Sequence, residues 1–168
     1  MDSEAWNKKQ QKIIPQEDID FENAKNVFNS ILHDYDVTYT QTGLFDPTDM
    51  RFSYEANATT TRKFNVEIKA RNDNGSRTEI PLKVVKYCDM KEDTKDDENL
   101  LYISLVNDYE YYIFDLSRMD WNQVDVRNWW IFDYQYADED NRKKVKTPTY
   151  FFPTELACAH GIIPKWYL

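Results

Sequence analysis

Two neighbouring runs of alternating polar and apolar residues constrain the fold of this chain more than any other feature. The alternation runs through residues 49–55 and returns in residues 64–71, after the polar stretch Asn57–Thr61. Because successive side chains of a β-strand point to opposite faces, each run predicts a strand with one apolar and one polar face. The polar stretch suits a turn, so the two runs together predict an antiparallel hairpin.

The polar face of this hairpin gathers two carboxylates and a lysine. Glu67 and Lys69 are two residues apart and therefore share a face, while Ile68 points to the core. A hairpin centred near residue 59 places Asp49 opposite Lys69, and one centred near residue 58 places Asp49 opposite Glu67. Both registers bring the three charged side chains within reach of one another. Arg71 lies farther along the same face.

Two carboxylates beside a lysine suit phosphodiester hydrolysis that is assisted by a divalent metal. Carboxylate oxygens hold Mg²⁺ while leaving coordination positions for water and a phosphate oxygen. The metal makes water a stronger nucleophile and neutralises the charge that develops on phosphorus. The lysine can orient the attacking water or stabilise the transition state, and Arg71 could bind a neighbouring phosphate.

Helices are expected on both sides of the hairpin. Apolar residues at helical spacing predict a helix that starts near Asp18 or Asp20 and continues to Leu32. Residues 1–17 are expected to be a polar lead-in, because Pro15 disfavours a helix through them. Residues 78–91 are expected to form a second helix, with a proline tolerated in its first turn.

The remainder of the chain is expected to consist mainly of strands and turns. Two strands are predicted at residues 100–106 and 109–116, around a turn at Asn107-Asp108. A last hairpin is predicted between residues 129–136 and 143–152. Thr154–His160 is expected to form a short helix that ends at a glycine.

The residues Pro47-Thr48-Asp49, followed on the next strand by Glu67-Ile68-Lys69, resemble the motif of the PD-(D/E)XK nuclease superfamily. The expected order of elements is also similar: a leading helix, the aspartate strand, the Glu-x-Lys strand, a helix bearing Lys86-Tyr87 and a further strand. Within the superfamily, the chain most resembles small phage or prokaryotic proteins. The resemblance covers residues 18–118.

The resemblance implies a mixed α/β fold of the restriction-endonuclease-like type, in which helices flank a central mixed sheet. Residues 1–168 would form one domain, with the nuclease-like core in 18–118 and a β-rich C-terminal extension in 119–168. The implied function is that of a metal-dependent nuclease that hydrolyses DNA with Mg²⁺ or Mn²⁺. The implied site residues are the metal ligands Asp49, Glu67 and the backbone carbonyl of Ile68, the catalytic lysine Lys69, and Glu22 as an extra acid.

The charge of the chain bears on whether such a protein can bind DNA. A net charge of −9 argues against a protein that coats nucleic acid non-specifically. Basic side chains are nevertheless concentrated in residues 61–91 and 141–168, each with a net charge of +4. These two islands either line one phosphate-binding surface or are ordinary solvated faces. The candidate phosphate-binding residues are Arg71, Lys83, Lys86, Arg142, Lys143 and Lys144.

Two other functions fit the same pattern. Ion pairs across the hairpin would produce it without any catalysis, in an unrelated α+β domain that acts in protein–protein interaction. A nuclease fold that has lost its activity could likewise serve in an assembly, for instance that of a mobile element. The choice between DNA and RNA as substrate, and whether two copies pair to cut both strands, stay open.

The location of the protein is predicted from segments that the sequence lacks. The longest apolar stretch is strand-sized, and residues 1–12 are polar, so neither a membrane span nor a secretory signal is expected. Only Cys88 and Cys158 are present, which favours a reducing setting. A cytoplasmic protein encoded by a host, a phage or a mobile element is therefore expected, with no membrane partner.

Overall fold

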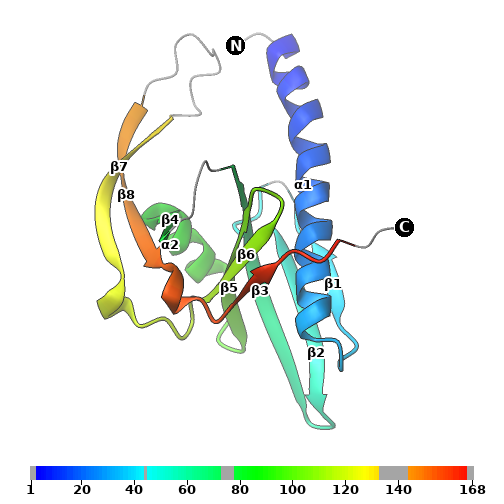
Figure 1. The fold of residues 1–168 in the computed structure, drawn as a ribbon. Helices are drawn as coiled ribbons and strands as arrows, with labels where there is room; N and C mark the ends of the chain where they lie inside the picture. Colours follow the sequence, from blue (N-terminus) through cyan, green and yellow to red (C-terminus); the bar gives the residue numbers. More distant parts are fainter. Residues whose placement is uncertain (1–2, 44, 73–77, 133–143, 166–168) are drawn as a thin grey trace.

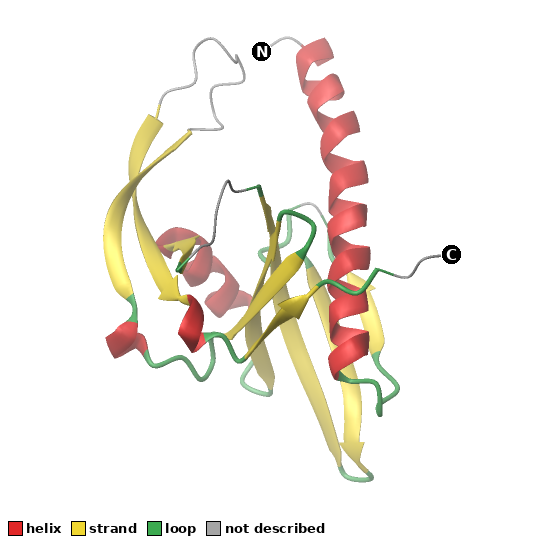
Figure 2. Ribbon diagram, viewed as in Figure 1, coloured by secondary structure: helices red, strands yellow, loops and turns green. Residues whose placement is uncertain are grey.

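The computed structural model describes residues 3–43, 45–72, 78–132 and 144–165, which form a mixed α/β fold (Figures 1 and 2). In the described residues, the strands form one sheet of order β1-β2-β3-β5-β6-β9 and a second of order β4-β8-β7. The elements are α1 (Ser3–Ile31), β1 (Thr38–Gln41), β2 (Met50–Asn57), β3 (Thr60–Arg71), β4 (Glu79–Lys83), α2 (Val84–Asp93), β5 (Glu98–Val106), β6 (Glu110–Asp115), η1 (Trp121–Gln123), β7 (Asp125–Phe132), β8 (Lys144–Pro153), η3 (Thr154–Leu156) and β9 (Ala159–Ile162).

The predicted hairpin is formed by β2 and β3, and its register is the one centred near residue 58. Met50 pairs with Val66, and Phe52 pairs with Phe64. The same register, continued by one residue, sets Asp49 opposite Glu67. An irregularity near Asn57 shifts the pairing beside the turn by one residue.

The large sheet is mixed, because β5 runs parallel to β3 while its other pairs are antiparallel. A parallel neighbour requires a long crossover, and β4 and α2 lie within it. The next connection is the predicted tight turn. Asn107 and Asp108 have φ angles of 55° and 52°, the left-handed values of a type I′ hairpin turn.

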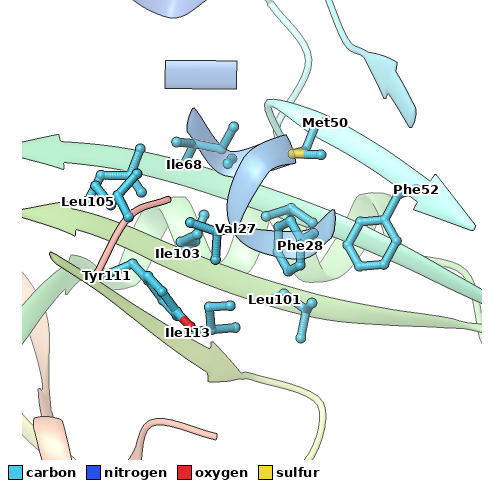
Figure 3. Close-up of a cluster of buried hydrophobic side chains, with 13 residues drawn as sticks. Val27, Phe28, Met50, Phe52, Ile68, Leu101, Ile103, Leu105, Tyr111 and Ile113 are labelled. Atoms are coloured by element: carbon cyan, nitrogen blue, oxygen red, sulfur yellow. The ribbon is translucent and has the colours of Figure 1, made fainter. Parts of the chain in front are cut away.

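Helix α1 covers one face of the large sheet. The apolar stripe of its second half, with Ala24, Val27 and Phe28, is buried against side chains of β2, β3, β5 and β6. Figure 3 shows this core, in which Phe28 lies beside Phe52 at a ring distance of 4.6 Å. The packing fixes the helix across the strands that carry the candidate site.

The opposite face of the large sheet is covered by α2 and the second sheet. The core of this layer contains Ile80 and Leu82 of β4, Met90 of α2, Tyr102 of β5 and Phe152 of β8, all of them buried. Glu67 belongs to this face and is covered by protein, whereas Arg51 and Lys69 on the same face of the hairpin stay exposed. The structure therefore buries a charged group that sequence alone would leave in solvent.

The predicted helix over residues 78–91 is replaced by a strand and a shorter helix. Residues 79–83 form β4, which lies at the edge of the second sheet and pairs with β8. The alternating burial of Ile80 and Leu82 stabilises the strand, and an edge strand tolerates Pro81, which has no backbone N–H. The helix then starts at Val84 and continues beyond the expected end, to Asp93.

The expectation that residues 1–17 are not helical is wrong. Helix α1 begins at Ser3 and passes through Pro15. A proline within a helix removes one hydrogen bond and costs about 3 kcal/mol. The preceding residues 4–12 are rich in alanine, glutamate, lysine and glutamine, which favour helix and offset part of this cost. No helix in the described part of the chain combines the length and the apolar character that crossing a membrane requires.

Residues 119–165 are joined to both sheets. The predicted last hairpin exists as β7 and β8, with Trp129 opposite Thr147, although the residues expected to form its turn lie outside the described part. The short helix expected over Thr154–His160 is a single 3₁₀ turn, η3, followed by β9, which pairs with β6. Figure 1 shows the β7–β8 hairpin and α1 on opposite sides of the molecule.

The turn between β5 and β6 offers a direct test of this topology. A non-glycine residue at positive φ is strained, and glycine removes the strain. We expect Asp108→Gly to raise the free energy of unfolding by about 0.5 kcal/mol in urea titration. Asp108→Ala is the matched control, because it removes the same charge and keeps the Cβ; lower stability for the glycine variant than for the alanine variant would contradict the turn geometry.

Candidate active site

The candidate site lies where β3 extends beyond the end of its pairing with β2. The pairing of the two strands ends at Met50 and Val66, whereas β3 continues to Arg71 and stays paired with β5. From residue 67 onward, the β2 side of β3 therefore carries no partner strand. A cavity of about 390 Å³ lies here, lined by β3, α1, α2 and the segment that leads into β2.

Asp49 takes the place of the missing strand. Its backbone N–H donates to the Val66 carbonyl at 2.9 Å. Its side-chain Oδ2 accepts a hydrogen bond from the Ile68 N–H at 2.8 Å. The carboxylate thus satisfies a strand-edge donor of β3, and this bond fixes its orientation beside Glu67.

Glu67 is the buried acid of the site, with only 3% of its surface exposed. Lys86 Nζ of α2 lies 3.2 Å from Glu67 Oε2, but the contact is an ion pair and gives that oxygen no hydrogen bond of regular geometry. Burial, followed by the negative charge of Asp49, raises the pKa of Glu67 to about 8. Lys86 and Lys69 offset part of this rise in pKa.

The cavity as a whole carries more negative than positive groups. Lys69, exposed and two residues beyond Glu67, also lines it. Five carboxylates and two lysines contribute to its wall: Glu17, Asp20, Asp46, Asp49 and Glu67 against Lys69 and Lys86. Such a surface attracts cations and, without one, repels a phosphate group.

Two of these carboxylates, Glu17 and Asp20, come from α1. Burial is the first cause that raises the pKa of each, and Asp49 contributes to both rises. Sequence reasoning missed them, since it placed residue 17 in a non-helical lead-in. Their spacing of three residues, continued by Phe21 and Ala24, is the helical signal that could have identified them.

The structure brings together most of the predicted catalytic residues and disperses the others. Asp49, Glu67, Ile68 and Lys69 line one cavity, together with Lys86. The predicted extra acid Glu22 is exposed on α1, lies outside the cavity lining and pairs with Lys25 at 3.5 Å. Glu17 and Asp20 are the acids that α1 supplies instead.

Arg71 also lies outside the cavity and is directed into the protein. Its Nη2 donates to the Pro81 carbonyl at 2.6 Å and to the Tyr102 hydroxyl at 2.7 Å. The guanidinium therefore ties the end of β3 to β4 and β5. This packing role replaces the phosphate contact expected from the sequence.

The remaining basic candidates do not form one described surface. Lys83 lies on β4 opposite Thr149, and Lys144 begins β8 opposite Phe132. Arg142 and Lys143 fall outside the described residues. Among the described residues of the first basic island, Lys69 and Lys86 are the basic side chains that line the cavity, and the joining of the two islands stays a prediction.

The donor set of the cavity is suited to a hard cation. Within the described ranges, no group of three or more His, Cys, Asp or Glu side chains is arranged to hold a metal ion. Asp49 and Glu67 provide two carboxylates, which matches Mg²⁺, an ion that usually keeps several waters and takes one or two carboxylates. Glu67 Oε2 faces the Lys86 ammonium at 3.2 Å, so an ion bound by this oxygen would compete with that group.

Comparison of the chain with family models, curated proteins and solved structures found no match. The chemistry of the site is therefore inferred from its own residues. A fixed carboxylate, a buried carboxylate with a high pKa and an exposed lysine can bind a cation and a phosphate side by side.

The high pKa of Glu67 makes stability depend on pH. This pKa is about 8 in the folded protein and 4.5 ordinarily, so between these values the folded state holds a proton that the unfolded chain has released. The stabilisation is complete below the lower value and is lost as the pH rises through the upper one. We expect the unfolding free energy of metal-free protein to fall between about pH 5 and pH 8, by at most about 1.4 kcal/mol per pH unit.

The Glu67→Gln variant isolates this effect, because glutamine does not titrate. Urea denaturation of both proteins across the same pH range measures the difference in slope. Parallel stability curves for wild type and variant would show that Glu67 is not the buried titrating group.

Proposed function

We propose that the protein is a metal-dependent nuclease that hydrolyses phosphodiester bonds of DNA at the Asp49, Glu67 and Lys69 site. The observation that carries this proposal is the position of the two carboxylates on adjoining segments at the open end of β3. Ile68 N–H holds one of them, and Lys69 follows on the same strand within one cavity of about 390 Å³.

We also propose that the chain has the restriction-endonuclease-like form of the mixed α/β fold. The support is the order α1, β2, β3, α2 and β5, with β5 parallel to β3. In this arrangement the acid-bearing hairpin and the following helix meet at one cavity. Strand β4 and the second sheet would be additions to that plan.

Asp49 and Glu67 would hold Mg²⁺ or Mn²⁺, with the backbone carbonyl of Ile68 as the further ligand expected from the resemblance. The cation would activate water as a nucleophile and neutralise the charge that develops on phosphorus. Asp49 is already oriented by the Ile68 N–H. Glu67 would release its proton on binding a cation, since a positive charge at 2–3 Å favours the carboxylate.

Lys69 would position the reacting groups. Its ammonium group has three N–H donors, which can bind a non-bridging phosphate oxygen or hold the attacking water in line. It lies on the same face as Glu67 and is exposed at the cavity, so it can reach a substrate that remains largely in solvent. The flexible side chain of Lys69 can follow the changing geometry at phosphorus while its backbone stays in β3.

The excess of carboxylates supports a strict requirement for metal. Five acidic groups against two lysines repel a phosphodiester, and a divalent cation offsets much of that local negative charge. The same acidity fits the net charge of −9, which disfavours non-specific coating of nucleic acid. Binding would therefore be local and would depend on the cation.

Cleavage assays on purified protein test the proposal. We expect nicking or cutting of single-stranded, duplex or branched DNA in Mg²⁺ or Mn²⁺ and none in EDTA. Glu67→Gln and Lys69→Ala should each lower the rate by at least about 100-fold, because each removes a group that binds or stabilises the reacting centre. Gel electrophoresis of labelled oligonucleotides measures the rates.

Two matched controls separate the site from general charge effects. Glu22→Gln removes a carboxylate of α1 that lies outside the cavity, and Lys63→Ala removes an exposed lysine of β3 that pairs with Asp97 at 3.1 Å. Both should retain wild-type rates. Activity that survives Glu67→Gln, or that does not require a divalent cation, would refute the proposal.

The assay also separates the alternatives from the nuclease. A folded protein that neither binds Mn²⁺ nor cuts, but holds a stable protein partner, would be the inactive nuclease-fold module. A crystal structure in which Asp49 and Glu67 diverge, rather than facing a common point, would indicate an unrelated α+β interaction domain. Cleavage of RNA but not DNA would keep the mechanism and change the substrate.

A further inference from the structure

The positive charge of Lys86 is unfavourable at its position near the start of helix α2. Lys86 lies in the first turn of α2, where the helix dipole places partial positive charge. That turn has no acidic residue, and Lys83 provides no side-chain cap. A cation placed where the helix disfavours it indicates a tertiary role for the side chain.

The tertiary partner of Lys86 is the buried acid of the site. Nζ lies 3.2 Å from Glu67 Oε2, with the Lys86 side chain 32% exposed and that of Glu67 4% exposed. The ammonium group thus supplies positive charge to a carboxylate that protein otherwise surrounds. A divalent cation shared by Asp49 and Glu67 would have to enter beside this ammonium, and the two positive charges repel.

A second acidic environment lies on the other side of Lys86. An open hollow of about 540 Å³ is lined by Phe45, Asp46, Pro47, Asp89, Glu92 and Asp93, and Lys86 contributes to its wall as well. Asp89 is three residues along the same helix, the spacing at which oppositely charged side chains pair. Asp89 is therefore a candidate alternative partner for the Lys86 ammonium on the same helix.

We propose that Lys86 is a counter-ion switch: it pairs with Glu67 in the metal-free protein and turns to the acidic hollow when a divalent cation binds. The proposal rests on the proposed function, because the cation is the one held by Asp49 and Glu67. It assigns a role to the carboxylates of the hollow: Asp93 already pairs with Arg51 at 3.1 Å, and the others receive the displaced ammonium. Lys86 is in this sense a positioning residue that sets the affinity and selectivity for the cation.

The direction of the effect follows from charge balance. If Glu67 is ionised, a divalent cation adds two positive charges next to Lys86. If Glu67 is protonated, the cation adds two and releases one, so the net gain is still positive. Removal of the lysine charge therefore tightens cation binding in both cases, whereas a lysine that merely supports the site would weaken it when removed.

The first experiment titrates the protein with Mn²⁺ alone and measures binding by electron paramagnetic resonance of the free ion. We expect Lys86→Met to lower the dissociation constant roughly tenfold relative to wild type. Lys91→Met is the matched control. It removes the same charge from the same helix, where Lys91 lies over the Tyr87 ring at 6.0 Å, and should change the constant less than twofold.

The second experiment uses the wild-type chain, so its outcome does not depend on whether a variant folds. The side-chain ¹⁵Nζ and ¹³Cε signals of Lys86, assigned through bonds, are followed by NMR as Mg²⁺ is added. We expect them to shift with the same saturation curve as the backbone amide of Ile68, which donates to Asp49. The signals of Lys91 should stay in place.

The outcomes separate this proposal from the proposed function. Wild-type protein that binds Mn²⁺ as tightly as, or more tightly than, Lys86→Met overturns the switch and leaves the nuclease proposal standing. Lys86 signals that stay unchanged while Mg²⁺ shifts Ile68 also overturn it. Wild type and Lys86→Met that both remain folded and bind no Mn²⁺ overturn the metal site and the switch together.

Discussion

The hydrogen bond from the Ile68 N–H to Asp49 is the contact on which the rest of the site depends. Strand β3 extends past the first residue of β2, so one edge of its last residues would otherwise expose an unpaired backbone donor. The carboxylate of Asp49 fills that position at 2.8 Å. This bond satisfies the backbone donor at the strand edge and fixes the Asp49 carboxylate beside Glu67. The same break in strand pairing leaves the space that becomes the cavity.

The two layers around the large sheet explain why the acids of this cavity differ. Asp49 lies at the open end of the sheet and is partly exposed, whereas Glu67 lies under α2 and is buried. Burial in a low-dielectric layer favours the neutral acid, which accounts for a pKa near 8. Helix α1 adds Glu17 and Asp20 from the other side. Acidic groups thus converge from both layers on a space that Lys69 and Lys86 also line, an arrangement that favours entry of a cation.

Much of the hairpin and the core of the site could be predicted from the sequence, because both follow from a period of two residues. Alternation alone placed Glu67 and Lys69 on one face, and only the register relative to Asp49 was left open. The irregularity near Asn57 shifts the pairing by one residue and decides that register, which no local pattern reveals. The left-handed Asn107-Asp108 turn could also be predicted from the sequence, since it depends on two adjacent residues.

The features that sequence reasoning missed depend on contacts between distant segments. Strand β4 is stabilised by β8, some seventy residues later, so its own residues looked like the start of a helix. Arg71 looked like a phosphate ligand, because the Pro81 carbonyl and the Tyr102 hydroxyl come near it only in the folded protein. Lys86 was expected to bind phosphate, because its pairing with Glu67 likewise arises only in the folded protein. Glu17 was missed because Pro15 disfavours a helix through residues 1–17, whereas α1 starts at Ser3 and includes them.

The central claim is that Asp49 and Glu67 hold one divalent cation between them. The most direct test is a crystal of the protein soaked in Mn²⁺, with anomalous diffraction used to locate the ion. We expect one strong peak within coordination distance of both carboxylates, absent from crystals of Glu67→Gln. A cavity with no peak, or a peak bound only by Glu17 and Asp20, would contradict it.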